Sequence, residues 1–108
     1  MNVKRGEVYW IQFDPSIGSE IKKTRPAVIV SSNTSNQYLD RFQVAPLSTN
    51  VQKIYPGEAI VTVKDVQSKM MGNQITTISQ MRIENYLTTL SLEDVQSIDA
   101  ALRVQLGL

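Results

Sequence analysis

Short runs of β-branched, aromatic and other apolar residues, separated by turn-forming residues, make up roughly the first eighty positions of the chain. Runs of this kind, bounded by Gly, Pro, Asn, Asp or Ser, are typical of β-strands. They predict strands at residues 7–14, 26–32, 42–47, 58–63 and 74–78. The apolar positions of residues 26–32 follow one another without alternation, which predicts a central strand that is buried on both faces.

Two segments carry helical signals, a weak one and a strong one. Residues 32–37 are rich in turn and cap formers, which predict either a loop or one helical turn. Ser91 with Asp94 resembles a capping box that has aspartate in the place of glutamate. Beyond it, apolar residues recur on one helical face, at Val95, Ile98, Leu102 and Leu106. The second pattern predicts an amphipathic helix over residues 92–106.

The order of these elements defines the expected fold class. Strands followed by one helix, without regular strand–helix alternation, predict an α+β chain that is mostly β, with a small curled sheet or barrel and a C-terminal amphipathic helix. A chain of 108 residues buries about two thirds of its surface on folding and does not divide into two stable halves. We therefore expect a single domain over residues 1–108.

Composition narrows the chemistry that the chain can perform. It contains no cysteine, which excludes disulfides, thiolate catalysis and cysteine-ligated zinc. It contains no histidine, which removes the usual general base near neutral pH and excludes histidine-based hydrolases and ribonucleases. The carboxylates lack the spacing of a metal-binding loop, and no glycine-rich nucleotide-binding motif is present. We expect no metal and no cofactor.

Charge and hydropathy bear on location. The formal net charge is +1, with a slight basic excess at the front that weakly favours contact with a polyanion. No apolar run is long enough to cross a membrane, and residues 1–5 lead into a strand pattern without the apolar core of a secretory signal. We therefore expect a cytoplasmic protein with no membrane contact.

Two polar segments carry groups suited to binding phosphate. The loop before the second strand holds Lys22, Lys23 and Arg25, whose cationic groups attract a phosphate backbone, and the guanidinium can hold a phosphate through two hydrogen bonds. The end of the third strand supplies the adjacent hydroxyls of Ser48 and Thr49, which can donate hydrogen bonds to phosphate oxygens. Each segment also has an ordinary explanation, as a solvated basic loop or as turn chemistry.

Aromatic and methionine side chains have both core and binding explanations. Trp10 and Phe13 have opposite parity on one strand, so at most one of them faces a typical interior unless the strand lies between two layers. The other is expected in a groove or an interface, where an exposed ring can stack on a base. Met70, Met71 and Met81 suit either gaps in the core or an adaptable partner surface.

Taken in order, several sequence blocks resemble those of the MazF/PemK toxin family and together span nearly the whole chain. Both the order and the spacing of the blocks match. The blocks are KRGEVYW (4–10), FDP (13–15), GSE (18–20), RPAVIVS (25–31), VAPLS (44–48), NQITTI (73–78), Arg82 and LGL (106–108).

This resemblance implies a compact SH3-like or CcdB-like barrel with a long C-terminal helix, assembled as a homodimer. It implies an endoribonuclease that cuts single-stranded RNA, chiefly messenger RNA, at short motifs in a groove across the dimer interface. Family members use no metal, and the ribose 2′-hydroxyl attacks to leave a 2′,3′-cyclic phosphate and a 5′-hydroxyl. A cognate antitoxin protein would occupy the RNA groove, and expression of the toxin alone would arrest growth.

The resemblance also implies roles for particular residues. Arg25 matches the catalytic arginine, and Ser48 stands where many members have the catalytic threonine, with Thr49 as an alternative one position later. Glu20 matches a recurrent acidic residue near the site. Gln74 matches a recurrent glutamine, for which substrate positioning or a structural role is expected.

Departures from the family pattern keep two alternatives open. Serine replaces threonine at Ser48, Thr76 and Ser79 stand where arginine and aspartate are common, and Ser19 stands where some relatives have histidine. One alternative is an inert module that binds nucleic acid or antitoxin. The other is a gyrase poison of the CcdB type, which binds DNA gyrase through its terminal helix. The Arg25 block and the two hydroxyls favour the ribonuclease, because a gyrase poison needs no phosphate-binding groups in a groove.

Overall fold

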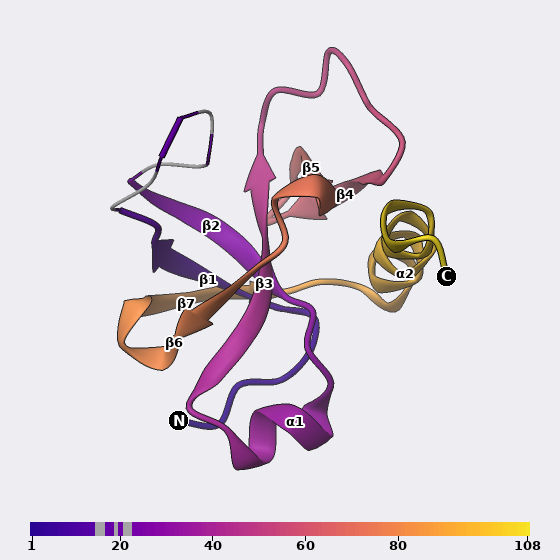
Figure 1. Cartoon of the computed structure of the whole chain (residues 1–108). Coiled ribbons are helices and arrows are strands. Elements are labelled where there is room, and N and C mark those ends of the chain that lie inside the picture. Colours follow the sequence, from indigo (N-terminus) through magenta and orange to yellow (C-terminus); the bar gives the residue numbers. More distant parts are fainter. Residues whose placement is uncertain (15–16, 19, 21–22) are drawn as a thin grey trace.

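A computed structural model describes residues 1–14, 17–18, 20 and 23–108 of the chain (Figure 1). The described elements are mostly strands, with one long helix at the C-terminal end. In chain order they are β1 (Glu7–Gln12), β2 (Thr24–Ile29), α1 (Asn33–Tyr38), β3 (Arg41–Ser48), β4 (Glu58–Val63), β5 (Val66–Met71), the 3-10 turn η1 (Gly72–Gln74), β6 (Thr76–Ser79), the 3-10 turn η2 (Gln80–Arg82), β7 (Ile83–Thr89) and α2 (Leu92–Leu106).

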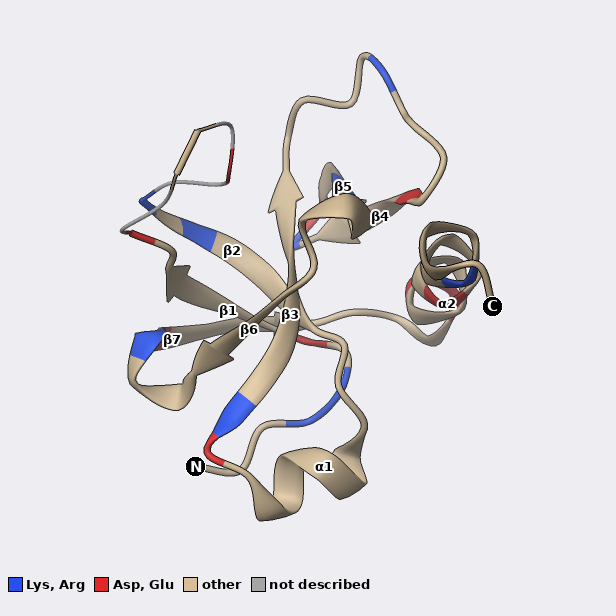
Figure 2. Cartoon of the chain, viewed as in Figure 1, with Lys and Arg blue, Asp and Glu red and all other residues tan. Residues whose placement is uncertain are grey.

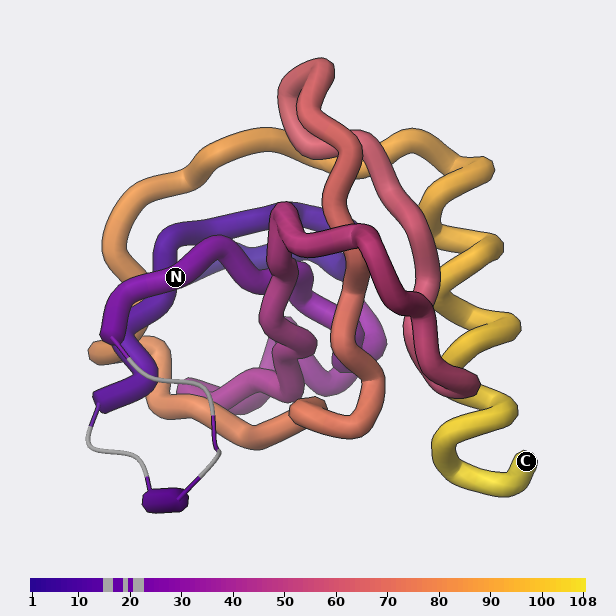
Figure 3. The backbone as a smooth tube through the Cα atoms, turned by 90° about the horizontal axis from the view of Figure 1, so that it is seen from above, coloured from indigo at the N-terminus to yellow at the C-terminus, as the bar shows by residue number. Residues whose placement is uncertain are grey.

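Strand β3 lies at the centre of the seven-stranded antiparallel sheet that the described residues form. On one side β3 pairs with β2, which leads on to β1 and β7. On the other side the first half of β3 pairs with β6 and its end pairs with β5 of the β4–β5 hairpin. Because β3 exchanges one neighbour for another along its length, the sheet curls into a half-barrel, and α2 packs outside it (Figure 3).

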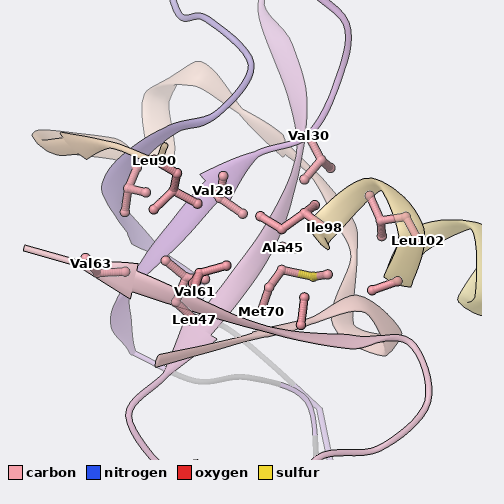
Figure 4. Packing of buried hydrophobic residues seen from close by; sticks show 13 residues of the cluster. Val28, Val30, Ala45, Leu47, Val61, Val63, Met70, Leu90, Ile98 and Leu102 are labelled. Carbon is pink, nitrogen blue, oxygen red and sulfur yellow. The ribbon is translucent and has the colours of Figure 1, made fainter. Parts of the chain in front are cut away.

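Buried apolar side chains form one cluster on each face of this sheet. The helix cluster, between the sheet and α2, consists of Val8, Val28, Val30, Ala45, Leu47, Ala59, Val61, Val63, Met70, Leu90, Ile98, Ala101 and Leu102 (Figure 4). The barrel cluster, inside the curl, consists of Val3, Tyr9, Ile11, Phe13, Ala27, Ile29, Phe42, Val44, Ile78 and Ile83. Successive residues of β2 alternate between the clusters, so the expectation of a strand buried on both faces is confirmed.

Each of the five predicted strands overlaps an observed one, and the expected mostly β architecture is confirmed. The predicted bounds of β4 and α2 are the observed bounds. Residues 33–38 form the short helix α1, so the helical alternative for this segment is right and the loop alternative is wrong. The last predicted strand begins later than expected, because Gln74 belongs to η1.

The sequence pattern does not predict β5 or β7. Strand β5 reads VQSKMM and buries Ser68 and Lys69, so its polar residues do not mark its exposed face. The turn before β5 consists of Lys64 and Asp65, both with positive φ (48° and 68°). A two-residue hairpin turn needs this conformation but usually has Asn or Gly there, so the two turn residues themselves do not identify the turn.

Helix α2 begins and ends with the expected kind of caps. The Ser91 hydroxyl oxygen accepts a hydrogen bond from the Asp94 N–H at 3.1 Å, and Gly107 ends the helix in the left-handed conformation that favours glycine. Ile98 and Leu102 are buried as predicted, but Leu106 is 53% exposed, so its assignment to the buried face is wrong. At this end of the helix the side chain of Gln105 lies next to Gly57, in the turn before β4.

Charged residues are distributed over several strands, loops and α2 rather than gathered on one of them (Figure 2). The distribution of charged residues therefore does not single out a binding face. In the described part of the chain, no helix is long and apolar enough to cross a membrane, and acidic side chains nowhere form a group of three or more suited to holding a metal ion.

Candidate active site

A pocket of about 350 Å³ opens where β1, β2 and the end of β3 meet the β4–β5 hairpin and β7. Its apolar walls are formed by Trp10, Pro26, Leu47, Val63, Val66 and Leu87, and its polar groups come from Arg25, Ser48, Thr49, Lys64 and Ser68. The described lining residues include two cations and no carboxylate. An apolar pocket with a few polar groups is typical of a ligand site, and the excess positive charge favours an anion.

Strand geometry places Trp10 in this pocket. Trp10 is 37% exposed, whereas Phe13 is buried in the barrel cluster. The expectation that one of these two rings is exposed in a groove is therefore confirmed. Trp10 pairs with Pro26 in the β1–β2 ladder, so both residues contribute to the same part of the pocket.

A β-bulge brings Leu87 to the wall near Trp10. Thr88 of β7 pairs with Val8 of β1, and Tyr86 of β7 pairs with Tyr9. Between these two pairs β7 has one more residue than β1. Leu87 is the extra residue, and its half-buried side chain lines the pocket and packs against the helix cluster. Bulges are common next to functional sites because they redirect a side chain.

Arg25, Ser48 and Thr49 come together in this pocket although they are distant in the sequence. Arg25 lies on β2 and Ser48 ends β3, while β2 and β3 are neighbours in the sheet. Arg25 and Thr49 are exposed and Ser48 is half-buried. A guanidinium beside two hydroxyls supplies several hydrogen-bond donors that can converge on one phosphate.

Ser48 combines turn chemistry with a free donor. Its hydroxyl oxygen accepts a hydrogen bond from the Asn50 N–H at 3.1 Å, and the Asn50 side-chain oxygen accepts one from the Gln52 N–H at 3.3 Å. The expectation that this segment shows turn chemistry is therefore correct. A hydroxyl that accepts one hydrogen bond can still donate its own proton, so the same Ser48 side chain can also bind an oxyanion.

The segment after Ser48 is anchored by a buried ion pair. Lys69, the pairing partner of Ser48 on β5, contacts Glu58 at 3.0 Å, and their side chains are 11% and 5% exposed. The Lys69 ammonium also donates to the Lys53 carbonyl at 2.9 Å, and the Glu58 carboxylate accepts from the Tyr55 N–H at 2.8 Å. These contacts tie residues 53–58 to β5 and so restrain the segment that leads away from the pocket.

Three of the four predicted substrate-binding residues, Glu20, Lys23 and Gln74, are described, and they do not line the pocket. Glu20 accepts a hydrogen bond from the Ile17 N–H at 2.6 Å. Lys23 has a positive φ of 66°, and its N–H donates to the Asp14 carboxylate at 2.8 Å. Gln74 is half-buried in η1. Lys22, like Ser19, lies outside the described residues.

Arg82 restrains the end of β1, where the chain leaves the sheet for the loop that leads to Arg25. Its guanidinium donates to the carbonyl oxygens of Gln12 at 3.0 Å and Asp14 at 2.5 Å. The Phe13 N–H donates to the Lys23 carbonyl at 2.8 Å, which closes the loop on its other side. The two ends of the loop before Arg25 are thus fixed by contacts with the sheet.

Tyr9 is the titratable group with the clearest perturbation, and it lies outside the pocket. Burial and a hydrogen bond to the Glu7 carboxylate at 2.9 Å raise the pKa of Tyr9 to about 12. A phenol with this pKa stays protonated at neutral pH. Tyr9 therefore does not serve as a general base there.

Two lining residues, Lys64 and Leu87, are not among the predicted site residues. Lys64 is a common surface residue type in a turn without glycine, and Leu87 lies in a strand whose bulge hides its alternation. The one available signal is the pair Val63 and Val66 around a two-residue gap, which is the spacing of a tight hairpin.

Fold and pocket together define the chain as a small half-barrel protein with a phosphate-suited site beside an apolar wall. The family described as the PemK-like, MazF-like toxin of type II toxin-antitoxin systems matches residues 4–106. The chain belongs to this toxin family, which confirms the expected family.

Relatives of the chain agree with this assignment. Endoribonuclease MazF9 of Mycobacterium tuberculosis is 30% identical over 115 aligned residues, which cover 98% of each protein. The crystal structure of MazF from Deinococcus radiodurans has a TM-score of 0.86 at 20% identity and covers 100% of this chain and 99% of that one. An endoribonuclease from Mycobacterial species, in complex with its cognate antitoxin, has a TM-score of 0.83 at 22% identity, with 98% and 96% covered. The expected fold class is confirmed, and the enzyme class, endoribonuclease, is confirmed through the family.

Proposed function

We propose that this toxin cuts single-stranded RNA, chiefly messenger RNA, at short sequence motifs and without a metal ion. The products are a 2′,3′-cyclic phosphate and a 5′-hydroxyl. The observation that carries the proposal is the meeting of Arg25, Ser48 and Thr49 in one pocket that no described carboxylate lines. An RNA phosphate is the anion that best explains a guanidinium and two hydroxyls beside walls that can hold a base.

Arg25 stabilises the charge that develops on the phosphate. The ribose 2′-hydroxyl gives its proton to water, and its oxygen attacks phosphorus as the bond to the 5′-oxygen breaks. The departing 5′-oxygen takes a proton from water and becomes the 5′-hydroxyl. Negative charge grows on the remaining phosphate oxygens during this step. A guanidinium that is already in place stabilises this charge without reorganisation.

The hydroxyls orient the phosphate for in-line attack. Ser48 is fixed by its hydrogen bond with Asn50 and can donate to one phosphate oxygen. Thr49 makes no hydrogen bond through its hydroxyl with the described residues, so that hydroxyl is available for a second oxygen. Holding the reacting atoms in this geometry lowers the barrier by removing the entropic cost of bringing them together.

Trp10 and the apolar walls suit a nucleobase next to the cleaved bond. Base stacking on an aromatic ring is worth about 1–3 kcal/mol, and Trp10, which is 37% exposed, lines the pocket. We propose that one unstacked base enters the pocket. Glu20, Lys22, Lys23 and Gln74 remain predicted contacts with more distant parts of the RNA.

The proposal includes the partners that the family suggests. A homodimer would place two pockets along one RNA groove, and a cognate antitoxin would occupy that groove and prevent cleavage. The relative that was solved with its cognate antitoxin supports this regulation. Expression in the cytoplasm without antitoxin would arrest growth because messenger RNA is cut.

Cleavage of a defined RNA tests the proposal directly. The purified protein is incubated in excess chelator with a single-stranded RNA of varied sequence, and cut sites and end groups are mapped. Arg25→Ala is expected to lower the rate at least about a hundredfold, as for loss of one transition-state donor. Arg41→Ala is the matched control, since Arg41 is an exposed arginine on the same sheet whose ion pair with Asp40 is long, at 3.5 Å.

The two hydroxyls are separated by their own variants. Ser48→Ala and Thr49→Ala remove one donor each, and the variant with the larger loss in kcat identifies the main hydroxyl. Failure of the wild type to cut across broad sequence coverage would contradict the proposal. Inhibition of DNA gyrase supercoiling by the same protein would then favour the gyrase poison, and binding of RNA without cleavage would favour the inert module.

A further inference from the structure

Lys64 extends from the wall of the pocket itself. It is the first residue of the two-residue turn between β4 and β5, and it lines the same pocket as Arg25. Val63 and Val66 on either side pair with each other and both belong to the apolar wall. The hairpin therefore fixes the backbone of Lys64 next to the surface on which a base would lie.

The charge of Lys64 is not neutralised by its surroundings. Lys69 on the same hairpin pairs with Glu58, whereas Lys64 forms no ion pair with any residue that the structure describes, its neighbour Asp65 included. No described carboxylate lines the pocket. An unpaired ammonium at a pocket wall attracts an anionic ligand, most strongly at low salt.

The turn conformation does not explain why this position holds a lysine. The φ of Lys64 is 48°, in the left-handed region. This conformation favours glycine or asparagine and disfavours a residue with a long side chain. A residue kept in a disfavoured conformation at a binding site suggests that its side chain is needed there.

Building on the proposed function, we propose that Lys64 binds the RNA phosphate that flanks the scissile one. A nucleotide whose base lies between the apolar walls has a phosphate on each side. Arg25 with the hydroxyls holds the phosphate that reacts, and Lys64 holds the other. An ammonium on a flexible stem suits this task, because a backbone phosphate needs a nearby charge rather than a fixed bidentate geometry. Lys64 is thus a substrate-binding residue that does not touch the reacting atoms.

The variant Lys64→Asn tests this inference without risk to the hairpin. Asparagine tolerates the left-handed conformation better than lysine, so the variant is expected to be at least as stable as the wild type in thermal unfolding. Lys64→Arg keeps the charge, and Lys4→Asn is a matched loss of charge at an exposed lysine that does not line the pocket. Two readouts are compared: steady-state cleavage of an RNA with a mapped site, and binding of a single-stranded DNA, which lacks the 2′-hydroxyl and cannot be cut.

We expect Lys64→Asn to raise KM and the Kd for single-stranded DNA about three- to tenfold, with kcat within about twofold of the wild type. The slope of log Kd against log salt should fall by about 0.7, the value for one phosphate contact on a single strand. Lys64→Arg and Lys4→Asn should resemble the wild type.

Each contrary outcome has a distinct meaning. A wild type that cuts RNA, together with an unchanged KM, Kd and salt slope in Lys64→Asn, would overturn the Lys64 inference alone. The same would follow if the variant lost affinity only for an acidic peptide, since the site would then serve a protein partner. A wild type that neither binds nor cuts nucleic acid would overturn the proposed function, and the Lys64 inference with it.

Discussion

The two core clusters differ in their relation to the pocket. The helix cluster shares Leu47 and Val63 with the pocket wall, and Leu87 packs against it. The barrel cluster contributes no residue to the described lining. The buried Lys69–Glu58 pair lies on the β4–β5 hairpin, which contributes Val61 to the helix cluster. The barrel cluster instead contains the fully buried ring of Phe42. In this small fold one side of the sheet provides stability, and the other side also provides the binding surface.

The largest effect should follow from a change in the barrel cluster. Phe42 is fully buried, and Phe42→Ala is expected to lower the free energy of unfolding by about 3–5 kcal/mol, because it removes a large apolar side chain and leaves a cavity. Urea unfolding measures this loss. The folded fraction should keep the cleavage rate of the wild type, and Phe42→Leu should show the same pattern with a smaller loss of stability. A rate that falls in the folded fraction of both variants would show that the two sides of the sheet are coupled.

A change in the buried ion pair should affect both stability and chemistry. Lys69→Met leaves the Glu58 carboxylate buried without its cation, which is expected to cost about 3 kcal/mol of unfolding free energy. Because Lys69 also restrains residues 53–58 and pairs with Ser48, the cleavage rate should fall as well. Adding Glu58→Gln should recover part of the stability, as in a double-mutant cycle. A loss of stability with an unchanged rate would indicate that the segment after Ser48 does not depend on this anchor.

The smallest effect concerns pH and the barrel cluster. The pKa of Tyr9 is raised from 10.0 to about 12 in the folded chain. As the pH rises above about 10, the unfolded chain loses this proton while the folded chain keeps it. The contribution of Tyr9, roughly 2 kcal/mol, is therefore fully present below pH 10 and is lost as the pH rises toward 12. Chemical unfolding at pH 9 and 11.5 measures it, with Tyr9→Phe as the control. An equal loss in both proteins would assign the pH dependence to other groups.

Elements with a regular pattern could be predicted from the sequence. Strand β5, which buries polar groups, and β7, whose pairing with β1 has register shifts, could not. Strand β4 alternates strictly and α2 has a cap and one apolar face, so the predicted bounds of both are correct. The sequence pattern of β5 does not show which of its residues are buried. Its Lys69 is buried together with its ion-pair partner Glu58, a residue eleven positions away. Local sequence carries no information about such a partner.

The residues of the candidate site also fall into those that could be predicted from the sequence and those that could not. Arg25 and Ser48 were predicted because they stand at the ends of recognisable strands within family blocks, and the structure brings them together. Lys64 depends on the pairing of Val63 with Val66, which brings a turn residue to the pocket. Leu87 depends on a change of register between β7 and β1. Both are properties of strand pairing rather than of residue type.

The bulge at Leu87 makes the pocket sensitive to the deletion of a single residue. As regards pairing with β1, Leu87 is one residue more than β7 needs. Its deletion would allow regular pairing at Val8 and Tyr9, leaving the register shift between Tyr9 and Ile11, and would remove the leucine that lines the pocket. In this fold the loss of a single codon would therefore change both the pairing of two strands and the wall of the pocket, which makes the position a natural starting point for redesign of the pocket.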